Sequence, residues 1–316
     1  MKTTIFFKYF LLIVCSIYLI GCENESELQS VEEQIKTHPQ LQNLKKPDII
    51  LNPISNGVFY SNPINSIQKT SISGNNSNWY FKTYENSNRI ESITFEDPTY
   101  ICVESVATFF YKNEMIDKIE LKSINTCLEF ETSKIIQFNY DTGVLMSLFL
   151  KGYYKDEKTP EKLMSVGENF FSYNKNGTIA EMFTSIREVY EPLTGYQKLT
   201  FTYNENDNVI ETRQEFYGDS RYDAKYLFTY DTNLNPLKGI YFFSSLLVQM
   251  PQYSFETALG PIFLSNNCLK SSKRDYLYTQ NNADTTIPFE NIVENGKVIS
   301  FGSAPEYSRW FKNEIR

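Results

Sequence analysis

The sequence predicts an all-β fold: an antiparallel β-meander of about seven hairpin repeats of ~30 residues, curled into an open or barrel-like sheet. Three observations predict it. An aromatic motif recurs at nearly constant intervals, each copy is followed by turn-forming residues, and helical periodicity is almost absent. The chain of 316 residues also holds 23 Tyr and 24 Phe. Each buried ring removes about 150–250 Å² from water, so the aromatics can supply a large core.

The repeated motif is a Phe-x-Tyr pair followed by Asn or Asp. Because side chains alternate along a strand, residues two apart point to one face of the sheet. The recurring tyrosines are separated by 27, 29, 33, 30 and 27 residues, and they are Tyr84, Tyr111, Tyr140, Tyr173, Tyr203 and Tyr230. The copy at Tyr84 is degraded, and residues 292–298 fit the same frame as residues 173–179. The aromatic residues expected on the shared apolar face include Phe138, Phe171, Phe201 and Phe228.

An Asn-, Asp- or Gly-rich loop follows each aromatic pair, and such residues accept the positive φ of a tight reversal. An aliphatic residue such as Ile90, Ile179 or Val209 then opens the returning strand. Each unit is therefore expected to be a hairpin plus its connection to the next. The loops 204–208 and 231–235 are also rich in oxygen ligands, but neither has the spacing that wraps a calcium ion. Turn chemistry explains them better, and no metal site or cofactor is predicted.

The repeat is interrupted by an insertion at about 244–272, which could form a short helix followed by a loop. Asn235-Pro236 opens this stretch and Leu264-Ser265-Asn266-Asn267 closes it. Insertions on a scaffold often carry function. The alternative is a plug that covers one open end of the sheet.

Residues 1–21 are predicted to be an export signal. Lys2 and Lys8 precede an apolar run that ends at Gly21, and this run is shorter than the about 20 residues that a spanning helix needs. The closing residues, Leu19-Ile20-Gly21-Cys22, resemble the lipobox of bacterial lipoproteins. The resemblance implies cleavage before Cys22, acylation of its thiol (palmitate among the chains), and anchoring in the cell envelope. The expected location is the outer membrane, on either side.

A polar tether over residues 22–57 is expected to precede the repeat domain at 58–316. Acidic residues directly after Cys22 resemble the surface-export signal of Bacteroidetes lipoproteins, but a solvated spacer is the favoured interpretation. Without its signal, the chain has 28 basic and 38 acidic residues, a net charge of −10. Such a surface repels phosphate backbones, which argues against nucleic acid as a partner.

The cysteines have no metal-binding spacing. Cys15 leaves with the signal and Cys22 takes lipid, so Cys102, Cys127 and Cys268 remain in an oxidising compartment. Cys102 and Cys127 lie in successive apolar runs and could form a disulfide. Three buried thiols are the alternative. In the disulfide case Cys268 is left over and is expected to be buried.

Few residues offer catalytic chemistry. His38 is the single histidine and lies in the tether, which excludes Ser–His, Cys–His and histidine-zinc arrangements on the repeat scaffold. Carboxylate pairs suffice for glycoside hydrolysis. The candidates in or near predicted strands are Glu129, Glu131, Glu211 and Glu215. Exposed strand-face charges that discourage edge pairing are the more economical interpretation.

Some rings could be exposed platforms that stack on sugars. These glycan-stacking candidates are Tyr153, Tyr154, Tyr217, Tyr222 and Trp310. Core packing and cross-strand pairing are the alternative for each of them.

The Phe-x-Tyr-Asn/Asp units look like degenerate tyrosine–aspartate (YD) repeats of Rhs proteins. With the lipobox and the 235–267 interruption, the whole pattern is more closely similar to uncharacterised Bacteroidetes lipoproteins with YD-like repeats. The resemblance brings no catalytic residues, and the small number of units does not suit a toxin shell. The sequence thus predicts a non-enzymatic, membrane-anchored binding or scaffolding module whose partner is an envelope protein or a glycan. A carbohydrate-active enzyme is the alternative.

Overall fold

A computed structural model describes most of the predicted repeat region. The residues that it describes are 37–50, 66–70, 76–85, 87, 89–96, 103–127, 129–188, 193–218, 223–235, 238, 264–276, 285–295, 297–303 and 310–313. The chain divides into two compact units, Met1–Asn43 and Leu44–Arg316. The described part of the first unit holds one short 3-10 helix, η1 (Pro39–Leu41). The signal and the lipidation site lie outside the described residues.

The second unit is built from β-strands. The structure describes sixteen of them: β1 (Ser66–Thr70), β2 (Asn76–Thr83), β3 (Ile90–Glu96), β4 (Val103–Lys112), β5 (Met115–Asn125), β6 (Phe130–Asp141), β7 (Val144–Asp156), β8 (Lys162–Tyr173), β9 (Ile179–Glu188), β10 (Gln197–Tyr203), β11 (Val209–Glu215), β12 (Ala224–Leu234), β13 (Asn267–Tyr276), β14 (Thr285–Glu294), β15 (Lys297–Ser303) and β16 (Trp310–Asn313). Within the described ranges, no helix combines the length and apolar character needed to cross a bilayer.

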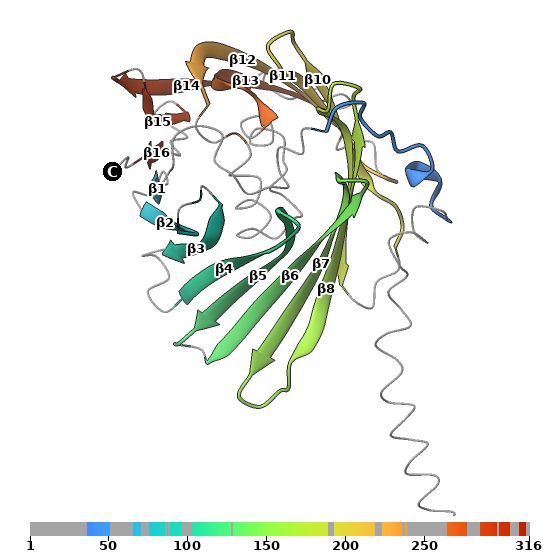
Figure 1. The fold of residues 1–316 in the computed structure, drawn as a ribbon, viewed down its shortest axis with the longest axis vertical. Helices are drawn as coiled ribbons and strands as arrows, with labels where there is room; N and C mark the ends of the chain where they lie inside the picture. The colour runs from blue at the N-terminus through green and yellow to red at the C-terminus, as the bar shows by residue number, and fades with distance from the viewer. Residues whose placement is uncertain are drawn as a thin grey trace, which may run out of the picture. The chain divides into compact units, whose positions relative to one another are not determined.

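The strands form one antiparallel meander, as the repeat predicts. Each strand pairs with its neighbours in chain order, and the long strands β4 to β8 lie side by side (Figure 1). β1 pairs with β2 and also with β16, so the strand order returns to its start and the sheet is closed. Closure was left open by the sequence, because the pairing of the first and last strands depends on the summed curvature of all the others.

The predicted repeat corresponds to a bulged hairpin. Seven hairpins, from β2–β3 to β14–β15, each show a register shift next to the turn. In five of them the residue after the shift is the repeated tyrosine, as in Tyr111 opposite Ile116 and Tyr203 opposite Val209. A bulge places an extra residue in one strand and strengthens the local twist. Repetition of the bulge therefore gives every hairpin the same bend.

The turns confirm the role of the Asx-rich loops. The two-residue turn between β4 and β5 places Asn113 and Glu114 at φ values of 49° and 69°. In the longer turn between β10 and β11, Asn204 Oδ1 accepts the backbone N–H groups of residues 206 and 208, each at 3.0 Å. Asp207 has a φ of 54° in this turn. At the corresponding place in the turn between β8 and β9, Gly177 has a φ of 89°. The oxygens of Asn204 are thus engaged in turn formation.

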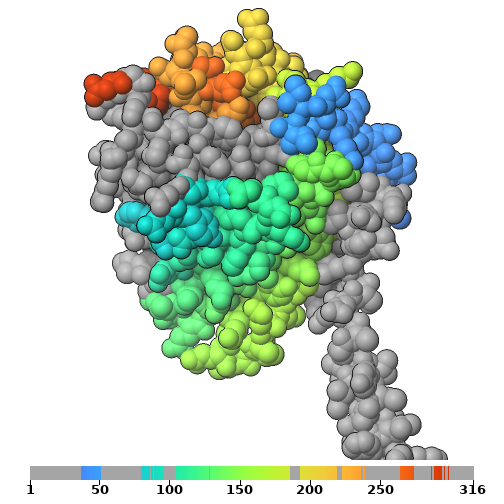
Figure 2. All heavy atoms as spheres, viewed as in Figure 1, coloured from blue at the N-terminus to red at the C-terminus, as the bar shows by residue number. Residues whose placement is uncertain are grey.

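The apolar core lies on one face of the sheet, which is the inner face because the sheet is closed. The four Phe residues predicted to share it, Phe138, Phe171, Phe201 and Phe228, are 3%, 0%, 6% and 4% exposed, which confirms the prediction. One continuous cluster runs from Phe81 on β2 to Val298 on β15. In the space-filling view, the side chains of β4 to β8 form one closely packed surface (Figure 2).

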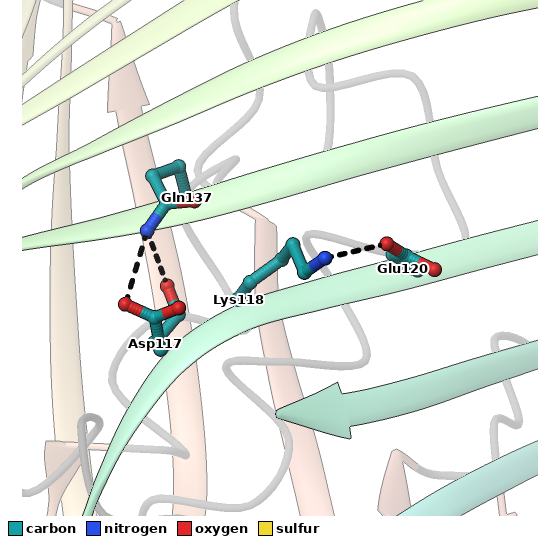
Figure 3. A network of polar contacts seen from close by, with 4 residues as sticks. All are labelled: Asp117, Lys118, Glu120 and Gln137. Atoms are coloured by element: carbon teal, nitrogen blue, oxygen red, sulfur yellow. Dashed lines mark hydrogen bonds and ion pairs between the residues drawn. The ribbon is translucent and has the colours of Figure 1, made fainter. Parts of the chain in front are cut away.

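The other face carries charged side chains in pairs. Lys118 and Glu120, two apart on β5, approach to 2.7 Å, as Figure 3 shows. Cross-strand pairs repeat the pattern further along the sheet, between Lys198 and Glu181 at 2.7 Å and between Lys225 and Glu211 at 2.9 Å. These side chains are about a third exposed, and such pairs contribute roughly 0–1 kcal/mol each. Their main effect is to make this face polar.

The end of the predicted tether lies with the sheet. The N–H of Tyr173 donates to the Lys45 carbonyl at 2.9 Å, and the N–H of Asp48 donates to the Lys175 carbonyl at 2.9 Å. Lys46 also forms an ion pair with Asp141, the last residue of β6. Residues 45–48 are therefore fixed at the end of the sheet where the hairpin turns lie.

Candidate functional site

The repeated tyrosines have a common hydrogen bond. A bulge takes the carbonyl of the aliphatic residue opposite the tyrosine out of the regular ladder, so that carbonyl needs another donor. The tyrosine of the following repeat supplies it. The hydroxyl donors and their carbonyl acceptors are Tyr111 to Ile90 at 2.8 Å, Tyr140 to Ile116 at 2.7 Å, Tyr173 to Leu145, and Tyr230 to Val209 at 2.6 Å. These four bonds each join a repeat to the one before it.

The bulge exposes a second carbonyl that is satisfied in a similar way. Asp117 is the extra residue of the bulge in β5, and its carbonyl accepts a hydrogen bond from Gln137 Nε2 on β6 at 2.8 Å (Figure 3). The same amide nitrogen also approaches Asp117 Oδ1 at 3.4 Å. Polar side chains of one repeat therefore complete the backbone of its neighbour.

The seventh repeat departs from this pattern. Its bulge places Val293 where five of the other repeats have tyrosine, and Asn291 where all six have phenylalanine. The sequence pattern matched Ile292 with Tyr173. Because the turn between β14 and β15 has only two residues, the structurally equivalent residue is instead Val293. Asn291 Nδ2 donates to the Leu269 carbonyl at 3.2 Å, which is the carbonyl that a tyrosine would otherwise reach. The Asn291 amide therefore stands in place of a phenylalanine ring and also makes the hydrogen bond that a tyrosine makes in other repeats.

An open pocket of about 830 Å³ lies next to this substitution, within the usual range for ligand sites of about 300–1,000 Å³. It is bounded by the turn between β10 and β11, the end of β12 and the facing parts of β13 and β14. Its described lining is rich in amides and hydroxyls and includes three rings. The described residues that line it are Asn204, Asn206, Asn208, Ile210, Phe228, Thr229, Tyr230, Asp231, Thr232, Asn267, Lys270, Phe289 and Asn291. We take this pocket as the candidate functional site.

Hydrogen bonds fix the frame of the pocket. Asn208 Nδ2 donates to Asn267 Oδ1 at 2.8 Å, and the N–H of Asn267 donates back to Asn208 Oδ1 at 2.8 Å. Asn267 Nδ2 also donates to the Asn233 carbonyl at 3.3 Å. Because both ends of each amide are engaged, these side chains hold one orientation. They join the β10–β11 turn rigidly to the start of β13.

The two ends of the insertion meet beside this frame. The N–H of Asn235 donates to the Asn266 carbonyl at 2.8 Å, and Asn235 Nδ2 donates to the Ser265 carbonyl at 3.0 Å. Ser265 Oγ accepts the Val209 N–H at 3.0 Å, and Asn266 Nδ2 donates to the Asn206 carbonyl at 2.8 Å. The residues that open and close the interruption in the sequence are thus fixed to each other and to the neighbouring turn.

The insertion takes the position of the turn between β12 and β13. Its last predicted residues, 267–272, belong to β13, and residues 239–263 lie outside the described part of the chain. Whether it forms the predicted helix or plug is therefore not decided by the described residues.

Asn291, in the pocket lining, has a polar atom without a partner among the described residues. Asn291 Nδ2 donates to both Asp231 Oδ2, at 2.8 Å, and the Leu269 carbonyl, which leaves Oδ1 as an acceptor. This Oδ1 is buried and has no hydrogen-bond partner in the described part of the chain. Asp231 also accepts two hydrogen bonds from Asn233, at 2.8 and 2.7 Å. The carboxylate is therefore occupied, and Asn291 Oδ1 is the buried acceptor of a lining residue that is left without a donor.

The sequence did not identify this site. The three predicted glycan-stacking residues whose side chains the structure describes, Tyr153, Tyr154 and Tyr217, do not line the pocket. Tyr154 packs against Phe130 with ring centroids 5.6 Å apart, while Tyr217 is 58% exposed. Tyr153 follows Gly152 on β7 and is half-buried, and Tyr222 and the side chain of Trp310 lie outside the described residues. The signal that could have found the pocket is the loss of the Phe-x-Tyr pair in the seventh repeat.

The candidate catalytic carboxylates lie on the strand surface. Glu211 pairs with Lys225 at 2.9 Å, and Glu215 pairs with Arg213 at 3.4 Å. Glu131 lies opposite Lys155 in the β6–β7 ladder, and Glu129 has a φ of 55° just before β6. None of them lines the pocket, and no group of three metal-ligating side chains occurs among the described residues.

The cysteines agree with part of the prediction. Cys268 is a free thiol and is 3% exposed, as expected for the leftover cysteine. Burial, together with the nearby Asp231 carboxylate, raises the pKa of its thiol to about 12. Cys127 is disulfide-bonded. Because Cys102 lies outside the described residues, the Cys102–Cys127 pairing stays a prediction.

Comparisons with known proteins give the following results. No protein-family model matches the chain, and no curated protein is similar to it in sequence. Among solved structures, a porin-like protein from Bacteroides uniformis is 14% identical with a TM-score of 0.45, over 83% of this chain and 100% of that one. A porin-like protein from Bacteroides vulgatus is 9% identical with a TM-score of 0.41, over 80% and 98%.

A third solved structure is the Tc holotoxin pore of Photorhabdus luminescens, which is 10% identical with a TM-score of 0.21. The match covers 78% of this chain but 15% of that one. None of these likenesses is close enough to transfer a function.

Proposed function

We propose that this chain is a lipid-anchored protein of the bacterial cell envelope that binds a ligand through its closed β-repeat sheet and catalyses no reaction. The observation that carries the binding role is the pocket beside β14, whose lining includes both a hydrogen-bonded amide frame and Asn291, whose buried Oδ1 has no partner in the described part. The anchoring role rests on Leu19-Ile20-Gly21-Cys22 and the apolar run before it. Fixed polar groups around an open pocket are typical of recognition sites.

The pocket supports binding better than hydrolysis of a glycan. A glycosidase needs two carboxyl groups on either side of the scissile bond. The described part of the lining contributes one carboxylate, Asp231, and that group already accepts three hydrogen bonds from amides and the backbone. Glu211 and Glu215, the candidates on the strands nearby, are engaged in ion pairs outside the lining.

Replacement of Cys22 tests the anchor. In cells fed an alkyne-labelled palmitate, the wild-type chain should take up the label and sediment with the envelope membranes. Cys22→Ser should lose the label and leave the outer membrane fraction, because the acylated thiol is absent. Cys268→Ser is the matched control, since it removes a buried thiol and should keep both properties. Undiminished labelling of Cys22→Ser would contradict the anchoring proposal.

Affinity capture tests the binding role. Full-length lipidated protein in detergent is immobilised and exposed to envelope extract of the producing bacterium, beside the variant Asn291→Phe. That variant restores the ring that other repeats carry in this row and should fill the pocket. We expect a protein or polysaccharide to be retained by the wild type and lost with the variant. If the two proteins retain the same components, the pocket is not the binding site.

A further inference from the structure

We propose that the pocket between the β10–β11 turn and strands β12 to β14 binds a neutral oligosaccharide, with Asn291 Oδ1 accepting a hydrogen bond from a sugar hydroxyl. This inference rests on the proposed binding function and names the ligand class for the same site. It follows from the hydrogen-bonding state of the lining, from its charge and from the pairing of the surrounding strands.

The orientation of the Asn291 amide is set by its surroundings. Its Nδ2 has two hydrogens, and both are used, by Asp231 Oδ2 at 2.8 Å and by the Leu269 carbonyl at 3.2 Å. A flipped amide would direct its oxygen at two acceptors, so Oδ1 must point the other way. A buried acceptor without a donor costs about 1–3 kcal/mol. A ligand hydroxyl that donates to Oδ1 relieves this cost, and the same hydroxyl can accept from another group.

The rest of the lining suits a polyhydroxylated molecule. The side chains of Asn206, Thr229 and Thr232 are exposed and offer amide and hydroxyl groups at the mouth of the pocket. Phe289 is half-buried and Ile210 is 37% exposed, which provides an apolar strip for the C–H face of a sugar ring. The amides of Asn208 and Asn267 are already held at both their oxygen and their nitrogen, so they lose little conformational freedom when a ligand binds.

The charge of the lining argues for a neutral ligand. Among the described residues, the lining holds one acidic and one basic side chain, Asp231 and Lys270, so neither sign of charge dominates there. The chain as a whole is acidic, with a formal net charge of −8, and repels polyanions at longer range.

Strand pairing argues against a peptide at the same place. A peptide in extended form adds to a free sheet edge. β12 pairs with β11 and β13, β13 pairs with β12 and β14, and β14 pairs with β13 and β15, so these strands have no free edge beside the pocket. Recognition must therefore be made by side chains, as is usual for sugars.

The test is isothermal titration of the full-length lipidated protein in detergent against five neutral hexasaccharides: malto-, cello-, xylo-, manno- and chitohexaose. We expect at least one to bind, and we expect Asn291→Phe to weaken that binding at least about tenfold, a loss of about 1.4 kcal/mol. Asn206→Ala should weaken it as well. Asn139→Ala is the matched control, because Asn139 lies on β6, donates to Ser147 Oγ at 3.4 Å and does not line the pocket.

The outcomes separate this inference from the proposed function. If no hexasaccharide binds while the immobilised chain still captures an envelope protein in a way that Asn291→Phe abolishes, the sugar inference fails and the binding function stands. If neither sugar nor envelope component binds, both fail. Sugar binding that survives both Asn291→Phe and Asn206→Ala overturns the assignment to this pocket. Should Asn291→Phe not fold by circular dichroism, Asn206→Ala decides, because its exposed side chain has no role in the frame.

Discussion

The smallest unit that the fold repeats is one hydroxyl bonded to one carbonyl. Tyr111 donates to the Ile90 carbonyl at 2.8 Å, while its ring meets Tyr84 edge-on with centroids 5.8 Å apart. Tyr111→Phe keeps the ring and this contact but leaves the carbonyl at the bulge without a donor. We expect a loss of about 1–3 kcal/mol in the free energy of unfolding, measured by urea denaturation.

The control for this prediction is Tyr217→Phe. Tyr217 is 58% exposed, so loss of its hydroxyl should change stability by less than about 0.5 kcal/mol. If the two variants unfold at the same urea concentration, the hydroxyl–carbonyl row does not stabilise the sheet. The regular spacing of the tyrosines along the chain then needs another explanation.

Single residues also show where the sequence was informative. Phe138 and Phe228 were predicted to be buried because period-two alternation depends on local geometry alone, and both are at most 4% exposed. Asn291 was not predicted to be special, because its role depends on Asp231 and Leu269, which lie 60 and 22 residues away along the chain. Such contacts follow from strand order and register, which no local pattern contains.

At the scale of elements, the turn between β4 and β5 holds two residues with positive φ, and neither is glycine. Glu114 has a φ of 69°, a conformation that a side chain with a Cβ disfavours by roughly 1–2 kcal/mol. Its side chain is 79% exposed and forms an ion pair with Arg89, which at such exposure is worth little. We therefore expect Glu114→Gly to stabilise the protein by about 0.5–1 kcal/mol in urea denaturation.

Glu114→Ala separates the two effects in this turn. It removes the same ion pair as Glu114→Gly but keeps the Cβ at positive φ, so it should stabilise nothing. If alanine and glycine give the same unfolding midpoint, backbone strain at this position is not the reason for any change.

The elements differ in how well the sequence predicts them. The hairpins were predictable, because each needs one aromatic pair, one Asx-rich reversal and one aliphatic residue within about thirty residues of chain. The interruption was found, but the meeting of its two ends at Asn235 and Asn266 was not. That contact is made through hydrogen bonds to the β10–β11 turn, and only the three-dimensional order of the hairpins brings them together.

For the whole molecule, the inner row of tyrosines predicts how the fold responds to alkaline pH. Burial raises the pKa of Tyr111, Tyr173, Tyr203 and Tyr230 well above the usual value of 10.0. In the unfolded chain these hydroxyls ionise from about pH 10, so above that pH the folded state binds more protons than the unfolded state. Stability must then fall as pH rises, by about 1.4 kcal/mol per pH unit for each such tyrosine.

Two lysines act in the opposite sense over a different range. Burial lowers the pKa of Lys134 and Lys238, so their deprotonation favours the folded state up to the pKa of an unfolded lysine at about 10.4 and adds nothing above it. The loss of stability should therefore appear above this pH.

Tyrosinate absorbance and far-ultraviolet circular dichroism, followed together in a pH titration, should show a class of tyrosines that ionises only when the β-sheet signal is lost. Tyr111→Phe should make the pH dependence of stability shallower by about one proton, because one buried hydroxyl is missing from the row. Ionisation of all 23 tyrosines with an intact β-sheet signal would show that the row is open to solvent.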